Sequence, residues 1–188
     1  EVKLPNLTLL VTGGHTQLYL IKKNQNVVLL GETLDDALGE AFDKVAKILG
    51  LPYPGGKEIE QNAQNGDEDF FQLPKPMTSS DNFNFSFSGI KTAINLIAKK
   101  NKLDSNFINN ISASFQKCVA EILVNKLTVT LLKLKEKDID VKSFSLVGGV
   151  ANNNYLKLKL SELQDKYKID MLLPPSDMMS DNAAMIAW

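Results

Sequence analysis

The sequence predicts an α/β fold in which helices flank a mixed sheet. Short β-prone runs gather near the N-terminus, an apolar repeat of helical period follows, and strand and helix patterns then alternate. The 188 residues are 44% hydrophobic and 23% charged, close to the averages of globular chains. This composition excludes collagen-like, disordered and disulfide-rich classes, and we expect one domain or one lobe of a larger protein.

The chain begins with a predicted glycine hairpin. Residues 7–11 form a β-prone run, Gly13 and Gly14 provide a turn, and residues 16–21 alternate again. A third strand is expected at residues 27–30.

Residues 34–49 carry the strongest helix pattern. Apolar side chains recur with the spacing i, i+3, i+4, i+7 until Gly50 ends the repeat. Thr33, directly before the repeat, is the expected N-cap.

The next stretch lacks long periodic segments. Residues 51–82 are rich in Pro, Gly, Asn and acidic residues, so they predict irregular structure with one short helix at residues 57–64. In residues 83–87 phenylalanines alternate with polar residues, which predicts a strand or extended segment with one apolar face.

Two further helices are predicted at residues 90–100 and 107–137, the second after the expected cap Asp104. The β-branched residues 128–130 favour a break in its later part.

The C-terminal part alternates between the two kinds of element. The pattern predicts a strand at residues 143–147, a helix at 153–166, a strand at 169–173 and a final helix capped by Ser180.

Charge and composition limit the kinds of partner. With 21 basic and 22 acidic residues the net charge is −1, which gives no global attraction to nucleic acid or to anionic membranes. All basic residues are lysines, so anion recognition has to use backbone amides, hydroxyls, amide side chains and lysine charges. No apolar run approaches the roughly 18 residues that span a bilayer. The single cysteine, Cys118, excludes an intramolecular disulfide, and we expect a cytoplasmic location.

Two glycine turns are candidate anion sites. Residues 11–15 (VTGGH) leave the first strand, and residues 146–154 (LVGGVANNN) connect a strand to a helix start. Backbone amides at such positions suit phosphate or another anion. An ordinary hairpin turn and a plain strand-to-helix connection with Asn as cap remain open alternatives.

Acidic residues offer two more candidates. Asp36, Glu40, Asp43 and Lys47 share the helix face opposite the apolar stripe, which is either a solvated face or a cleft wall that accepts from ribose hydroxyls. Asp181 lies in the first turn of the final helix, where it either stabilises the helix dipole or binds a metal. With one histidine and one cysteine, a closed zinc site built from this chain alone is disfavoured.

The two glycine turns resemble the phosphate-binding hairpins of an actin/hexokinase-like, or ribonuclease H-like, nucleotide cleft. Six segments in order also resemble the TsaD family, formerly described as O-sialoglycoprotein endopeptidase. They are residues 11–18 (VTGGHTQL), 31–50 (GETLDDALGEAFDKVAKILG), 53–56 (YPGG), 85–91 (FSFSGIK), 147–153 (VGGVANN) and 180–187 (SDNAAMIA).

This resemblance implies an actin/hexokinase-like lobe and a transferase. Family members move the threonylcarbamoyl group from threonylcarbamoyl-AMP to N6 of the adenosine beside the anticodon, position 37, in tRNAs that read codons starting with A. The product is t6A. The resemblance also implies a divalent metal, Fe(II) or zinc, and bound threonylcarbamoyl-AMP or ATP. TsaB-like and TsaE-like proteins and tRNA are the implied partners, with no membrane.

The same resemblance implies site residues. The phosphate or carbamoyl part of the ligand would lie against Val11, Thr12, Gly13, Gly14 and His15. The nucleoside would contact Asp43, Gly56 and Asn153, with Glu60 at a position where many relatives carry an aspartate near the ribose. The metal would bind Asp181.

Relatives run to well over 300 residues and carry a metal-binding H-x-x-x-H segment just upstream of the VTGGH strand. We therefore expect residues 1–188 to be the C-terminal lobe of a two-lobed enzyme, with residues 174–188 returning towards the other lobe. By itself this fragment is expected to be inactive.

Two other functions stay open at this point. An actin-like module of the same pathway could bind a nucleotide or a partner without catalysis. The older metalloprotease description is disfavoured because no H-E-x-x-H occurs. Contact with tRNA, if this chain makes it, would use lysine clusters such as Lys99, Lys100 and Lys102, which are otherwise solvated helix ends.

Overall fold

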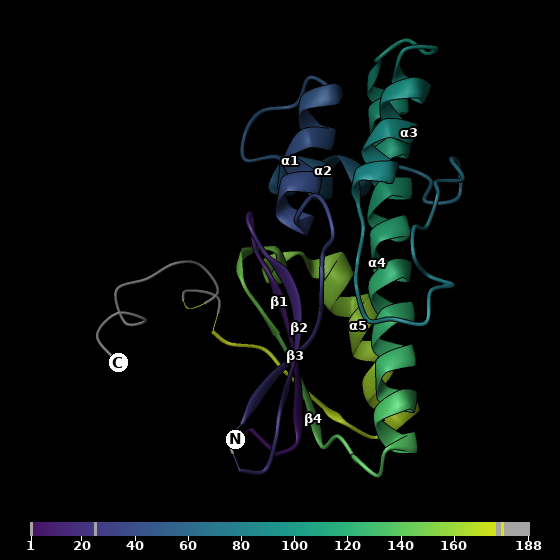
Figure 1. The fold of residues 1–188 in the computed structure, drawn as a ribbon. Helices are drawn as coiled ribbons and strands as arrows, with labels where there is room; N and C mark the ends of the chain where they lie inside the picture. Colours follow the sequence, from purple (N-terminus) through teal and green to yellow (C-terminus); the bar gives the residue numbers. More distant parts are fainter. Residues whose placement is uncertain (1, 25, 176–177, 179–188) are drawn as a thin grey trace.

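A five-stranded mixed sheet forms the centre of the protein (Figure 1). The computed structural model describes residues 2–24, 26–175 and 178. The strand order is β3-β2-β1-β4-β5, with β1 antiparallel to β2, β2 antiparallel to β3, and β4 parallel to both β1 and β5. The strands are β1 (Asn6–Val11), β2 (Thr16–Ile21), β3 (Val27–Glu32), β4 (Ser143–Val147) and β5 (Asp170–Leu172).

The described helices lie on one face and at one end of this sheet. Helices α4 and α5 run along the face, while α1, α2 and α3 gather at one end (Figure 1). Their bounds are α1 (Leu38–Ile48), α2 (Gly55–Ala63), α3 (Ser88–Ala98), α4 (Ser105–Glu136) and α5 (Asn154–Tyr167), with a short 3₁₀ helix at Gly149–Asn152. The predicted α/β class is confirmed. The predicted final helix, with its cap Ser180, lies outside the described residues.

The core forms between the sheet and the long helices. Every second side chain of the central strands faces the helices, so Leu7, Leu9, Leu18 and Leu20 are almost completely buried. Burying a leucine contributes about 1.5–3 kcal/mol, which makes this alternation the main reason for the strand register.

The predicted start of the first helix is wrong. Helix α1 begins at Leu38, because the backbone around Thr33 pairs instead with Phe85 in an isolated parallel bridge. The amide of Leu34 donates to the Phe85 carbonyl at 2.9 Å, and the Thr33 hydroxyl donates to the Asp36 carbonyl. The amide of Leu38 then donates to Thr16 Oγ1 at 2.8 Å. A buried threonine of β2 therefore caps the helix.

The predicted break at residues 128–130 is also wrong. Helix α4 continues without interruption through these residues. The Thr130 hydroxyl donates to the Lys126 carbonyl at 2.7 Å, and Leu127 and Leu131 pack in the core on either side. Tertiary packing outweighs the small propensity cost of β-branched residues.

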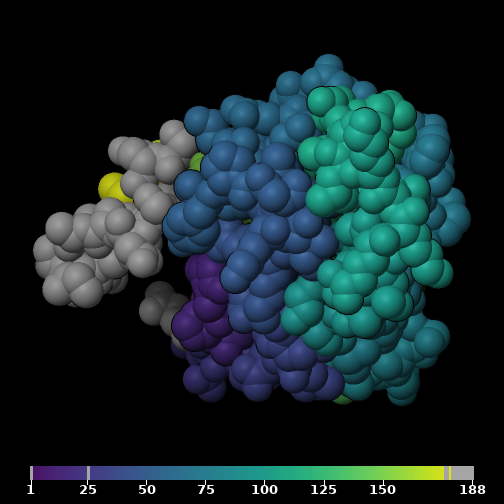
Figure 2. Space-filling view, turned by 90° about the horizontal axis from the view of Figure 1, so that it is seen from above, coloured from purple at the N-terminus to yellow at the C-terminus, as the bar shows by residue number. Residues whose placement is uncertain are grey.

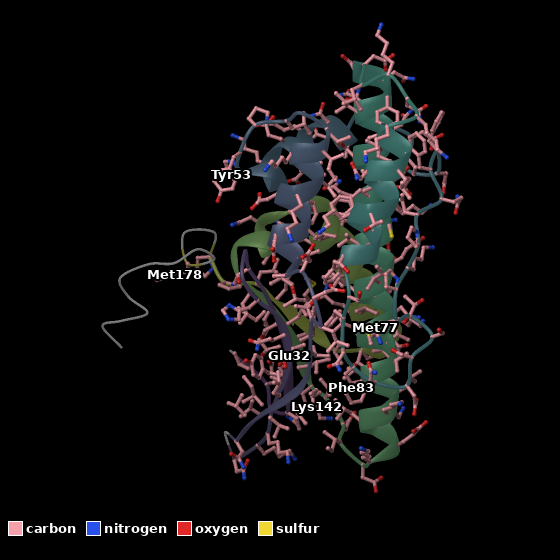
Figure 3. The ribbon with its side chains drawn as sticks, turned by 45° about the horizontal axis from the view of Figure 1, so that its top comes forward. Glu32, Tyr53, Met77, Phe83, Lys142 and Met178 are labelled. Atoms are coloured by element: carbon pink, nitrogen blue, oxygen red, sulfur yellow. The ribbon has the colours of Figure 1, made fainter. Side chains whose placement is uncertain are left out.

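Helix α4 also anchors the irregular stretch before α3. Lys126 is 1% exposed, and its amine donates to Ser80 Oγ at 2.8 Å and to the Asn82 carbonyl at 2.9 Å. Burial lowers the pKa of this amine. Residues 83–87, predicted as a strand or extended segment, make one isolated bridge through Phe85, and Phe87 is already the N-cap of α3 with ψ of −15°. Phe83 lies beside α4 (Figure 3).

No described helix combines the length and the apolar character that are needed to cross a membrane.

Candidate functional site

The two predicted glycine turns lie next to each other. Strands β1 and β4 are parallel neighbours, so both turns leave the same edge of the sheet. Gly148 has φ of 101° and ψ of 168°, a conformation that is almost restricted to glycine. A Cβ atom there would overlap the carbonyl group of Val11. The second turn therefore approaches the end of β1 more closely than any other residue type would allow.

Thr12 holds the first turn in shape. Its hydroxyl accepts from the amides of Gly14 at 3.2 Å and His15 at 2.9 Å, and its own amide donates to the His15 carbonyl at 2.8 Å. Helix α1 contacts this turn through Gly39, whose amide donates to the Thr12 carbonyl. A Cβ atom on Gly39 would lie 2.7 Å from that carbonyl oxygen.

Asp43 connects α1 to α2. Its Oδ1 accepts from the amide of Gly55 at 2.8 Å, and this fixes the first residue of α2. Gly55 is buried so closely that an added Cβ would lie 2.5 Å from the Ala46 methyl group. The two glycines of the YPGG segment thus have different surroundings, because Gly56 has open space beside it.

The start of α5 brings Asn153 and Glu60 together. Asn153 caps the helix by accepting from the Leu156 amide at 2.9 Å, and its own amide group donates to Gln116 Oε1 at 2.6 Å. Glu60, on α2, accepts from the amide of Asn154 at 2.8 Å. A carboxylate at this position stabilises the positive end of the helix.

These elements surround a cavity of about 400 Å³. Of the residues predicted from the sequence, Gly13, Asp43, Gly56, Glu60 and Asn153 line it. The other lining residues are Gly39, Phe42, Pro54, Lys57, Gly149, Val150 and Asn152. Figure 2 looks onto this end of the molecule, where α1 and α2 form the surface beside α3 and the start of α4.

The other predicted turn residues do not line the cavity. Val11 is buried at the end of β1, and Thr12 stabilises the turn. Gly14 and His15 are exposed next to Gly13. In the described structure, the first turn therefore contributes Gly13 alone to the cavity wall.

Sequence reasoning missed several lining residues. Phe42 belongs to the apolar stripe of α1, and Val150 follows the second glycine pair, so both were indistinguishable from core residues. Lys57 had a usable signal, because it lies one helical turn before Glu60 in the segment that follows YPGG. Phe42 and Val150 supply apolar surface, and Lys57 supplies a positive charge.

The acidic face predicted for the first helix divides into two parts. Lys44 pairs with Asp36 at 2.6 Å and with Glu40 at 2.7 Å, and these hydrogen bonds raise the pKa of the lysine amine. Asp43 lines the cavity, and Lys47 is exposed. The sequence left open whether this face is solvated or forms a cleft wall. Asp43 belongs to a cleft wall.

The described residues do not provide a metal site. They contain no group of three or more His, Cys, Asp or Glu side chains that could hold a metal ion. The predicted ligand Asp181 lies outside the described residues.

Asp35 organises the FSFSG segment next to the site. Its Oδ1 accepts from the amides of Phe87 at 2.8 Å and Ser88 at 3.2 Å, and its Oδ2 accepts from the hydroxyls of Ser86 and Ser88. Asp35 thereby caps α3 from the loop that precedes α1. Partial burial raises the pKa of this carboxyl group, but the four hydrogen bonds outweigh it and hold the pKa below its ordinary value.

The substitution Asp35→Asn is expected to lower the free energy of unfolding by about 1 kcal/mol. This is the usual effect of losing one helix cap at a site where solvent screens the charge. Because the folded pKa is depressed, the carboxylate stabilises the fold above the unfolded value of about 3.9 and loses this effect as the pH falls through the lower, folded value. Urea unfolding at pH 7 measures the loss of unfolding free energy, and a second series below pH 4 measures how much of that loss disappears when the carboxylate is protonated. An equal difference between variant and wild type at the two pH values would contradict the role of the charge.

Sheet order, glycine turns and cavity together define a class of protein, an α/β lobe of the actin/hexokinase-like fold. A solved structure supports this class. Full-length HypF in its phosphate- and nucleotide-bound form aligns with a TM-score of 0.65 and 14% identity, over 94% of this chain and 38% of HypF.

The chain belongs to the TsaD family, described as tRNA N6-adenosine threonylcarbamoyltransferase, whose model matches residues 1–188. Proteins with this name are 48% identical in Thermosipho africanus and 43% identical in Wolbachia pipientis wMel, in each case over the whole of this chain. The family resemblance seen in the sequence is confirmed. The chain spans 55% of the length of these two relatives.

Proposed function

We propose that this chain provides the donor-binding part of an enzyme that transfers the threonylcarbamoyl group from threonylcarbamoyl-AMP to N6 of adenosine 37 in tRNAs reading A-starting codons. The observation that carries the proposal is the cavity, in which five residues expected from the sequence lie together although they come from four separate segments. TsaB-like and TsaE-like partners, tRNA and a cytoplasmic location belong to the same proposal.

The cavity has a surface for each part of a nucleotide. Phe42 and Val150 provide apolar area for the base. Asp43 and Glu60 each use one carboxylate oxygen for a backbone amide, and in the described part of the chain their second oxygens make no hydrogen bond. In this proposal those oxygens accept from ribose hydroxyls.

The anionic part of the donor would lie towards the glycine turns. Exposed backbone at Gly13 and Gly149 lets an anion approach without side-chain obstruction, and Lys57 adds a positive charge at the wall. The carbamoyl oxygen would be polarised by the Gly13 amide, because the amides of Thr12, Gly14 and His15 make hydrogen bonds within the turn. A divalent metal, Fe(II) or zinc with Asp181 as a ligand, stays a prediction, because Asp181 lies outside the described residues.

Calorimetric titration of the chain with ATP and with a stable threonylcarbamoyl-AMP analogue tests the proposal. Asp43→Asn and Glu60→Gln are each expected to weaken nucleotide binding about tenfold or more, because each removes a charged hydrogen-bond acceptor. Glu58→Gln is the matched control, since Glu58 lies on the same helix without lining the cavity.

The alternative function, a partner-binding module without a nucleotide, predicts no heat of binding with either ligand. Wild-type affinity that is equal to that of both cavity variants would also contradict the proposed site.

A further inference from the structure

A second hollow lies beside the cavity. It has a volume of about 280 Å³, and we call it the rim hollow. Asp43 lines both spaces, so the rim hollow and the cavity adjoin at this side chain. The residues of the rim hollow are Glu40, Asp43, Lys44, Lys47, Leu51, Pro52, Tyr53 and Gly55.

The rim hollow carries an unusually exposed aromatic ring. Tyr53 is 84% exposed, more than any other large hydrophobic side chain among the described residues. Figure 3 shows it at the outer edge of the loop between α1 and α2, away from α4. The loop is held at both ends, because the Leu51 amide donates to the Ala46 carbonyl and the Gly55 amide donates to Asp43. The ring is thus presented to solvent on a firmly attached loop.

The two lysines of the rim hollow differ in their partners. Lys44 is engaged by Asp36 and Glu40. Lys47 is exposed and forms no ion pair with any described residue. Its charge is therefore available to an anion that approaches Tyr53 from outside.

We propose that the rim hollow binds an unstacked base of the RNA acceptor, with the ring of Tyr53 as the stacking surface and Lys47 near an adjacent phosphate. This inference rests on the proposed function, in which the donor occupies the cavity on the other side of Asp43. An acceptor base has to come close to a bound donor, and the rim hollow shares Asp43 with the donor cavity. An aromatic face with a nearby lysine is the usual contact for single-stranded nucleic acid.

Fluorescence anisotropy with a labelled RNA stem-loop that carries an unpaired adenosine tests the inference on the full chain. Tyr53→Ala is expected to weaken RNA binding about tenfold or more, because one base–aromatic stack is lost. Tyr53→Phe keeps the stacking face and is expected to bind like wild type. Calorimetric affinity for ATP is expected to stay unchanged in both variants, because Tyr53 does not line the cavity.

The charge is tested separately by salt dependence. Lys47→Gln is expected to reduce the slope of log affinity against log salt by about one, whereas Lys137→Gln, at the exposed end of α4, should leave it unchanged.

Three results would contradict the proposed stacking of an RNA base on Tyr53. Absence of RNA binding by wild type, an unchanged affinity of Tyr53→Ala, or equal losses in Tyr53→Ala and Tyr53→Phe would overturn the stacking role. Nucleotide binding without Tyr53-dependent RNA binding would overturn this inference alone. Loss of nucleotide binding by wild type would instead count against the proposed function.

Discussion

Gly148→Ala is expected to lower the free energy of unfolding by about 3 kcal/mol or more. Its backbone has φ of 101°, and an added methyl group would overlap the Val11 carbonyl. A non-glycine residue in this conformation costs about 1–3 kcal/mol, and relieving the overlap has to separate β1 from the second glycine turn. Urea denaturation followed by circular dichroism measures the change.

Gly149→Ala is the control for this substitution. An added Cβ at Gly149 would have no heavy atom within 4 Å, so the expected change is below about 0.5 kcal/mol. Equal destabilisation by the two alanines would show that general helix or turn preferences, rather than the close approach to β1, determine the effect.

Phe115→Ala is expected to cost about 3–5 kcal/mol, the usual range for removing a buried aromatic ring. Phe115 is completely buried on α4, and its ring lies 4.9 Å from that of Phe42 in an edge-to-face arrangement. Because Phe42 lines the cavity, the substitution should also weaken nucleotide binding in calorimetry.

The control is Phe70→Ala, the same truncation at a ring that is 58% exposed. Phe70 contacts Phe71 and lies away from the cavity lining, so we expect a loss below about 1 kcal/mol and no change in nucleotide affinity. If Phe115→Ala destabilised the fold but left nucleotide affinity intact, Phe42 would not depend on Phe115 for its position.

Most of the fold follows from local patterns. Alternation in residues 7–11 and 16–21 and the apolar repeat that ends at Gly50 identify elements whose interactions lie nearby in the sequence. The misplaced helix start has a different cause. Thr33 has the chemistry of a cap, but it pairs with Phe85, 52 positions later, and no local pattern contains that competitor.

The site was predictable where backbone geometry dominates. Two glycine pairs at the ends of strands predict adjoining turns once the strands are parallel neighbours. Side-chain roles were harder to derive, because Asp35 and Asp43 are both helix-associated acids in the same segment. Only the packing shows that Asp35 caps α3 while Asp43 lines the cavity.

The pairing of β1 with β4 also governs how the chain is assembled during synthesis. Asn6 donates to Ser143, 137 positions later, so the centre of the sheet is completed only after β4 has been synthesised. Until then Leu7 and Leu9, which are buried in the complete structure, lack the neighbours that cover them. Closing such a long loop is slow, and the interval exposes strand edges that attract other chains. The hairpin of β1 and β2 therefore exposes apolar side chains and a strand edge until β4 pairs with it.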